Sequence, residues 1–241
     1  MPEERTRAEE YAKRLAGAYG ESLVAVVLYG SAARGDYRAG VSDLNLLVIL
    51  HAADAATLRR GSALAQEWVA VGNPPPLVLG EAEWRESADV FAIEYSDMRD
   101  AHVILHGASP FAGLDIQWDD LRLQCEHELK TKQSRLREHY LLADSGEAVG
   151  KLLMYSFPTF LTLFRTGLRL AGREVSRAPE EVIGAIASLA GFDPAPFRAV
   201  HEARSGDLLG FSPSAEDPLV TGYIDSVKRM SQWLDGLDPP A

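Results

Sequence analysis

Two neighbouring places in the chain carry the residue types needed to hold a nucleotide triphosphate. Gly30 and Ser31 follow an apolar run over 22–29, and Asp43 and Asn45 open a second apolar run. A glycine–serine turn lets the backbone approach phosphates closely, and the serine hydroxyl adds a donor. Side chains at i and i+2 of a strand face the same way, so Asp43 and Asn45 can offer their oxygens to one cation. The pattern predicts a phosphate and Mg²⁺ site.

A two-metal site of this kind needs a third carboxylate, which can also take the proton of an attacking hydroxyl. Glu94 is the candidate, with Asp97 in reserve. We expect a strand over 90–95, on which Glu94 lies opposite the core residues Phe91 and Ile93. A solvent-facing glutamate would follow the same pattern, so the spacing leaves both interpretations open.

Three other residues leave alternatives open. Asn45 stands where a second metal carboxylate is expected; its amide oxygen can still coordinate Mg²⁺, but it brings no charge and cannot bridge two metals. Arg34 is either a surface charge or a phosphate contact after the Gly-Ser turn. Ser42 precedes Asp43, and that aspartate could instead be a simple turn former.

The first half of the chain alternates between the two periodicities of secondary structure. The expected helices are 5–19, 54–71 with Asp54 as N-cap, and 81–87; the expected strands are 24–29, 43–50, 77–79, 90–95 and 102–105. Along the strand over 43–50, Asp43, Asn45 and Leu47 should face one side and Leu44, Leu46 and Val48 the other. This order predicts an α/β (α+β) domain with a mixed sheet.

The second half lacks any convincing strand. Helical spacing predicts helices over 119–143, 147–171, 179–190, 194–203 and 217–235, and Pro158 should kink or split the second of these. We therefore expect a nucleotide-site domain over 1–112 and an all-α helical bundle over 113–241. Arg122 and His127 share a spacing seen in some helical ribonucleases, but a solvated helix face is the better interpretation.

Composition excludes several classes of function. The net charge of −11 argues against general nucleic-acid binding, which needs a basic face. The single cysteine, Cys125, excludes an intramolecular disulfide, and its helical context predicts a buried, inert thiol. The first residues have no apolar signal core, and no apolar run is long enough to cross a membrane. We expect a cytoplasmic protein without a membrane partner.

The segment Leu28-Tyr29-Gly30-Ser31-Ala32-Ala33-Arg34-Gly35 and the later Ser42-Asp43-Leu44-Asn45 together resemble the signature of the nucleotidyltransferase superfamily. That superfamily is typified by DNA polymerase beta and the aminoglycoside nucleotidyltransferases, and its motif is Gly-Ser, a spacer, then Asp-x-Asp or Asp-x-Glu. The resemblance implies that Gly30, Ser31, Arg34 and Ser42 bind the nucleotide. It also implies that Asp43, Asn45 and Glu94 form the catalytic and metal-binding set.

The resemblance implies a Mg²⁺-dependent enzyme that transfers NMP from an NTP, such as ATP, to a hydroxyl. The acceptor would be a small molecule such as an aminoglycoside, or a protein side chain, and the helical half would form its wall. The alternative is a nucleotide-binding or regulatory module of the same fold that has lost turnover through Asn45. A third hypothesis makes the first domain a scaffold and the helical half the interface of a homodimer.

Overall fold

The computed structural model describes residues 2–35, 37, 42–206 and 210–240. The chain divides into two compact units, Met1–Ile116 and Gln117–Ala241. None of the helices in the described part of the chain has the length and apolar content that a membrane crossing needs.

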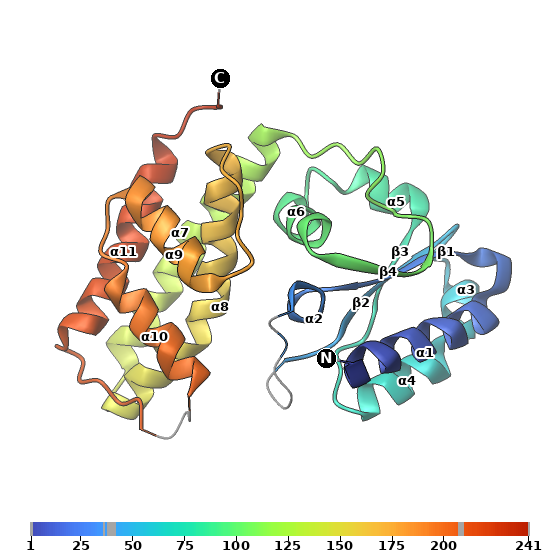
Figure 1. The fold of residues 1–241 in the computed structure, drawn as a ribbon, viewed down its shortest axis with the longest axis horizontal. Coiled ribbons are helices and arrows are strands. Elements are labelled where there is room, and N and C mark those ends of the chain that lie inside the picture. Colours follow the sequence, from blue (N-terminus) through green and yellow to red (C-terminus); the bar gives the residue numbers. More distant parts are fainter. Residues whose placement is uncertain (1, 36, 38–41, 207–209, 241) are drawn as a thin grey trace. The chain divides into compact units, whose positions relative to one another are not determined.

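The first unit packs helices of different lengths around a four-stranded sheet (Figure 1). Its helices are α1 (Pro2–Tyr19), the 3-10 helix η1 (Gly20–Ser22), α2 (Ser31–Arg34), α3 (Ala55–Arg60), α4 (Ser62–Ala70), α5 (Glu81–Glu86) and α6 (Ala92–Asp100). Its strands are β1 (Leu23–Tyr29), β2 (Asn45–Leu50), β3 (Leu77–Gly80) and β4 (His102–Gly107).

The sheet is mixed, as the sequence predicts. Its strand order is β3-β2-β1-β4. β1 runs antiparallel to both β2 and β4, whereas β2 and β3 are parallel. At one end of β1, Tyr29 pairs with Asn45 on β2 and with His102 on β4. The end of the Gly-Ser strand therefore lies beside the start of the strand that follows Asp43.

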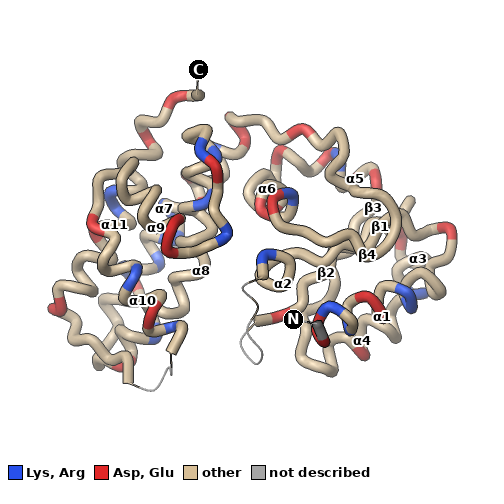
Figure 2. Tube along the Cα trace, in the orientation of Figure 1, with Lys and Arg blue, Asp and Glu red and all other residues tan. Residues whose placement is uncertain are grey.

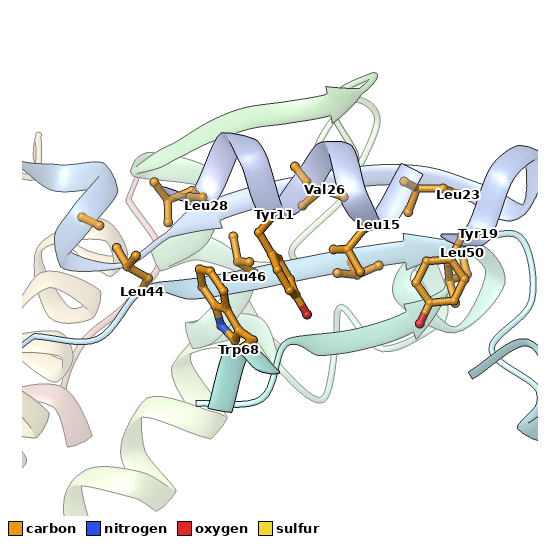
Figure 3. Packing of buried hydrophobic residues seen from close by; sticks show 14 residues of the cluster. Tyr11, Leu15, Tyr19, Leu23, Val26, Leu28, Leu44, Leu46, Leu50 and Trp68 are labelled. Atoms are coloured by element: carbon orange, nitrogen blue, oxygen red, sulfur yellow. The ribbon is translucent and has the colours of Figure 1, made fainter. Parts of the chain in front are cut away.

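Each face of the sheet has its own hydrophobic core. On one face, Tyr11 of α1 stacks on Trp68 of α4, with ring centroids 4.3 Å apart, over the side chains of Leu28 and Leu46 (Figure 3). On the other face, Trp84 of α5 lies within the core that includes Leu47. The expected division of β2 is confirmed, because Leu44, Leu46 and Val48 belong to the first core and Leu47 to the second.

The expected strand over 90–95 is wrong. This segment enters helix α6, and the Tyr95 N–H donates to the Phe91 carbonyl at 2.9 Å, which is an i to i−4 bond. In so short a window, alternating apolar residues also fit a helix, whose buried positions recur every three or four residues. The buried residues of α6 are Ala92, Ile93, Tyr95, Ser96 and Met98. The stack of Tyr95 on Trp84, with centroids 3.9 Å apart, packs α6 against α5.

Several element boundaries differ from those expected, and two of these differences change the description of the first unit. β2 begins at Asn45, so Asp43 lies in the segment just before the strand. The helix expected over 54–71 is divided at Gly61 into α3 and α4. The N-cap prediction is confirmed, because the Asp54 carboxylate accepts from the backbone N–H groups of Ala56 and Thr57 at 2.9 and 3.1 Å.

The described residues of the second unit form helices. These are α7 (Trp118–Leu142), α8 (Gly146–Leu170), α9 (Pro179–Ala190), α10 (Ala195–Ser205) and α11 (Pro218–Asp235). Helix α8 continues through Pro158, so the chain does not split there. Proline has no N–H for the carbonyl of Met154 four residues earlier. The guanidinium of Arg204, from α10, donates to that carbonyl instead.

We expect a double-mutant cycle to show that Arg204 supplies the hydrogen bond that Pro158 cannot donate to the Met154 carbonyl. Arg204→Met should lower the free energy of unfolding by about 1–3 kcal/mol, because it leaves the Met154 carbonyl without its charged donor. In a Pro158→Ala background the helix supplies an N–H, so the same substitution should cost clearly less. Urea unfolding of the four proteins measures the difference. Equal costs in both backgrounds would contradict the pairing of the Arg204 guanidinium with the Met154 carbonyl.

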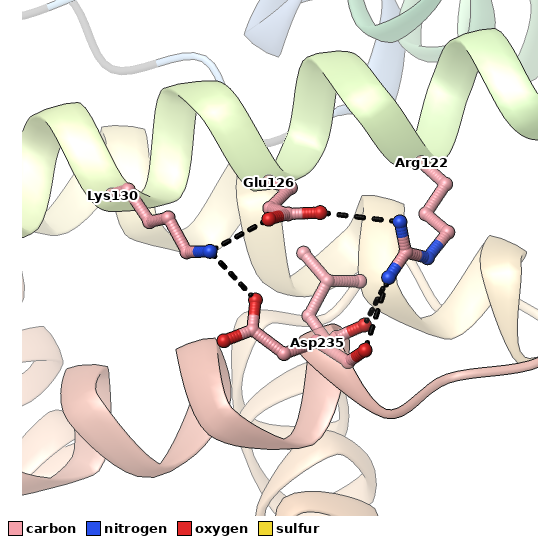
Figure 4. Close-up of polar contacts among 5 residues, drawn as sticks. Arg122, Glu126, Lys130 and Asp235 are labelled. Atoms are coloured by element: carbon pink, nitrogen blue, oxygen red, sulfur yellow. Dashed lines mark hydrogen bonds and ion pairs between the residues drawn. The ribbon is translucent and has the colours of Figure 1, made fainter.

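Arg122 ties α7 to α11 (Figure 4). Its guanidinium donates to the Glu126 carboxylate at 3.1 Å and to the Asp235 carbonyl at 3.1 Å. Lys130 bonds the same Glu126 at 2.6 Å and the Asp235 carboxylate at 3.0 Å. Arg122 therefore links α7 to α11, instead of lying on the fully solvated helix face that was expected.

Cys125 is fully buried on α7, as its sequence context predicts. Burial raises the pKa of its thiol to about 12. The thiol stays protonated at neutral pH and is inert toward oxidants that need a thiolate.

Candidate nucleotide site

The Gly-Ser turn has a backbone conformation that glycine alone adopts easily. Gly30 has φ 79° and ψ −150° and caps the short helix α2. Its carbonyl accepts from the N–H groups of Ala33 and Arg34 at 3.1 and 3.0 Å, which turns the chain sharply after β1. The turn leaves Ser31 half-buried in the first position of α2.

Gly30 and Asn45 lie in close contact. A Cβ added to Gly30 would lie 3.0 Å from Nδ2 of Asn45, tighter than nine in ten real Cβ contacts. A side chain at position 30 would thus press on the amide as well as strain the backbone. Asn45 is half-buried at the start of β2, on the same sheet face as Leu47, and Asp43 is exposed just before the strand. The structure thus brings together the Gly-Ser turn and the acid-amide segment.

Asn73 holds the residue between Asp43 and Asn45, and sequence analysis did not single it out. Its Oδ1 accepts from the Leu44 N–H at 3.3 Å, and only 8% of the residue is exposed. Its Nδ2 is buried and has no hydrogen-bond partner among the described residues. The one available signal was an asparagine directly before three prolines, where the chain must leave α4 and start β3. Asn73 fixes the backbone that carries the acid and the amide.

We expect Asn73→Ala to loosen this segment. A buried N–H that loses its acceptor costs about 1–3 kcal/mol, so the free energy of unfolding should fall by that amount. The Leu44 amide proton should exchange with solvent faster than in the parent, which NMR measures residue by residue. Ser96→Ala is the matched control, because the buried Ser96 hydroxyl has no hydrogen-bond partner among the described residues. An unchanged Leu44 exchange rate would contradict the role of Asn73.

Arg34 forms an ion pair with Asp97. Its Nη1 lies 2.8 Å from Oδ2 of Asp97, and the two side chains are 14% and 20% exposed. The pair joins α2 to α6. In Figure 2, α2 carries a basic residue, whereas α6 carries both acidic and basic residues. Glu94 lies one turn before Asp97, exposed in the first turn of α6. Asp97, the reserve candidate for the third carboxylate, is therefore ion-paired with Arg34. Glu94 lies on a helix and not on the expected strand.

The donors near this edge of the sheet suit Mg²⁺ chemically. Asp43 offers a carboxylate and Asn45 an amide oxygen, which are hard ligands. In proteins Mg²⁺ is commonly held by one or two carboxylates, with water and substrate phosphates completing the coordination. Among the described residues no three His, Cys, Asp or Glu side chains gather into a metal-binding group. The residues present fit a cation that the nucleotide helps to hold, and not a cage made by the protein alone.

The fold of this chain resembles that of a solved adenyltransferase. Among solved structures, the chain matches the crystal structure of the spectinomycin adenyltransferase AAD(9) from Enterococcus faecialis with ATP and spectinomycin. The TM-score is 0.57 at 12% sequence identity, over 95% of this chain and 99% of that one. No family model and no curated protein matches the sequence. The likeness confirms the expected fold: a mixed sheet with helices, followed by a helical region.

Proposed function

We propose that the chain is a Mg²⁺-dependent nucleotidyltransferase that moves NMP from an NTP to a hydroxyl acceptor. The observation that carries this proposal is the close approach of Gly30 to Asn45, which joins the Gly-Ser turn to the acid-amide segment. The fold adds support, because it resembles a solved adenyltransferase that was crystallised with ATP. By this proposal Gly30, Ser31 and Ser42 contact the triphosphate, and Asp43 and Asn45 hold the cation.

In the proposed reaction the acceptor hydroxyl oxygen attacks the α-phosphorus, the bond to the β-phosphate oxygen breaks, and pyrophosphate leaves. Glu94 is the residue proposed to take the hydroxyl proton, as the family resemblance implies. Arg34 then serves to hold α6, and with it Glu94, against α2. Mg²⁺, when bound by Asp43 and Asn45, would neutralise charge on the phosphates.

Asn45 itself favours a second candidate. An amide brings no negative charge to the cation, so a nucleotide-binding or regulatory module without turnover is consistent with this residue. The two candidates share the binding step and differ in the transfer step.

Calorimetric titration of each NTP, with and without Mg²⁺, tests the shared binding step. Pyrophosphate release in the presence of spectinomycin, other aminoglycosides or added protein tests the transfer step. The enzyme hypothesis expects both binding and release. Binding without release would support the regulatory module. If no NTP binds, both candidates are wrong.

A further inference from the structure

A groove of about 210 Å³ runs between α7 and α8 of the second unit. One wall is a row of cationic or N–H-donating side chains, Lys132, Arg135 and His139, spaced i, i+3 and i+7 along one face of α7. The opposite wall comes from α8. The groove lies within one unit and shares no residue with the nucleotide site.

The second wall supplies hydroxyl groups above an apolar floor. Tyr155 and Thr159 lie one turn apart on α8, and Tyr155 is 79% exposed although it is a large aromatic side chain. Ser156 lines the groove too, but its hydroxyl already contacts the Leu153 carbonyl at 3.1 Å and the Tyr223 hydroxyl at 3.0 Å. Leu136, Leu152 and Phe160 complete the floor. The available donors are therefore Tyr155, Thr159 and the row on α7.

The charge of the lining is opposite to that of the chain. The chain carries a net charge of −11, yet the described residues that line this groove include no aspartate or glutamate. Lys132 is partly neutralised by Glu128, whose carboxylate lies 3.4 Å from its Nζ. Arg135 has no ion pair among the described residues and presents a planar fork of N–H donors. Because ionic screening confines charge effects to about 10 Å, the local lining decides what binds.

We propose that this groove binds the phosphate group of a small organic molecule, independently of nucleotidyl transfer. A phosphate monoester offers three terminal oxygens, which suit the donors that Arg135, Lys132 and Thr159 bring to the lining, whereas a carboxylate offers two. The apolar floor and the exposed Tyr155 ring suit an apolar or aromatic body attached to that phosphate. The volume is below the roughly 300–1,000 Å³ of sites that enclose whole drug-sized ligands, so the groove would enclose only part of a nucleotide.

Titration of the full chain with phenyl phosphate in EDTA tests the proposal, because chelation removes the cation that the nucleotide site would need. We expect saturable binding in the millimolar range or tighter, and binding roughly tenfold or more weaker in Arg135→Gln. Arg137→Gln is the matched control, since Arg137 is exposed on the same helix but does not line the groove. Circular dichroism should show both variants folded. Arg135→Lys, which keeps charge but not the fork, should give intermediate affinity.

Separate arms distinguish other ligands. Phenol tests the apolar body alone, benzoate a carboxylate, and ATP in EDTA the nucleotide. Benzoate or ATP binding that exceeds phenyl phosphate binding and depends on Arg135 would overturn the assignment to a small phosphate monoester. Absent saturation, or equal losses in Arg135→Gln and Arg137→Gln, would overturn the site itself. Because the arms contain no Mg²⁺, failure here leaves the outcome of the NTP and pyrophosphate assays unaffected.

Discussion

Asp43→Asn should abolish NMP transfer. The substitution keeps the size of the side chain but removes the only carboxylate of the segment that the Gly-Ser turn approaches. Removal of a single group that stabilises transition-state charge typically costs roughly a hundred- to a thousand-fold in rate, and loss of the cation would add to that. Pyrophosphate release and NMP incorporation measure the effect, and calorimetry should show that the NTP no longer binds in a Mg²⁺-dependent way.

Asp54→Asn is the matched control for this experiment. It makes the same chemical change in the same unit, at an exposed N-cap position where asparagine also caps well. Its transfer rate should equal that of the parent. An Asp43→Asn protein as active as the parent would show that this segment does not hold the cation.

Asn45→Asp should strengthen the binding of Mg²⁺ and of the NTP. The added unit charge attracts a divalent cation by on the order of 2 kcal/mol at about 4 Å even in water-like surroundings, which corresponds to more than a tenfold gain in affinity. Asparagine and aspartate have nearly the same shape, so the contact with Gly30 should persist. Calorimetric titration with Mg²⁺ and each NTP measures the gain.

The same variant separates the two candidate functions. If the parent transfers NMP, Asn45→Asp should raise the rate at low Mg²⁺. If the parent only binds nucleotide, Asn45→Asp should create pyrophosphate release where the parent shows none. Identical binding and rates for the parent, Asn45→Asp and Asp43→Asn would rule out this segment as the metal site, and the nucleotidyltransferase hypothesis would then have to be withdrawn.

Features set by local chemistry could be predicted from the sequence. Leu44 and Leu46 alternate with Asn45 and Leu47, and because side chains alternate across a strand, the two faces of β2 followed directly. Asp54 caps α3 through bonds to residues two and three positions later. The turn at Gly30 was predictable for the same reason, because it depends on residues adjacent in the chain.

Only the tertiary structure decided the partners of the site residues. Asn73 reaches the Leu44 backbone across 29 positions, and Arg34 reaches Asp97 across 63. Alternation over 90–95 predicted a strand, but Tyr95 is buried in a helix, where it stacks on Trp84. Glu94 therefore lies in the exposed first turn of α6. Local propensity is a weak preference that packing overrides, and long-range pairs leave no spacing in the sequence from which to infer them.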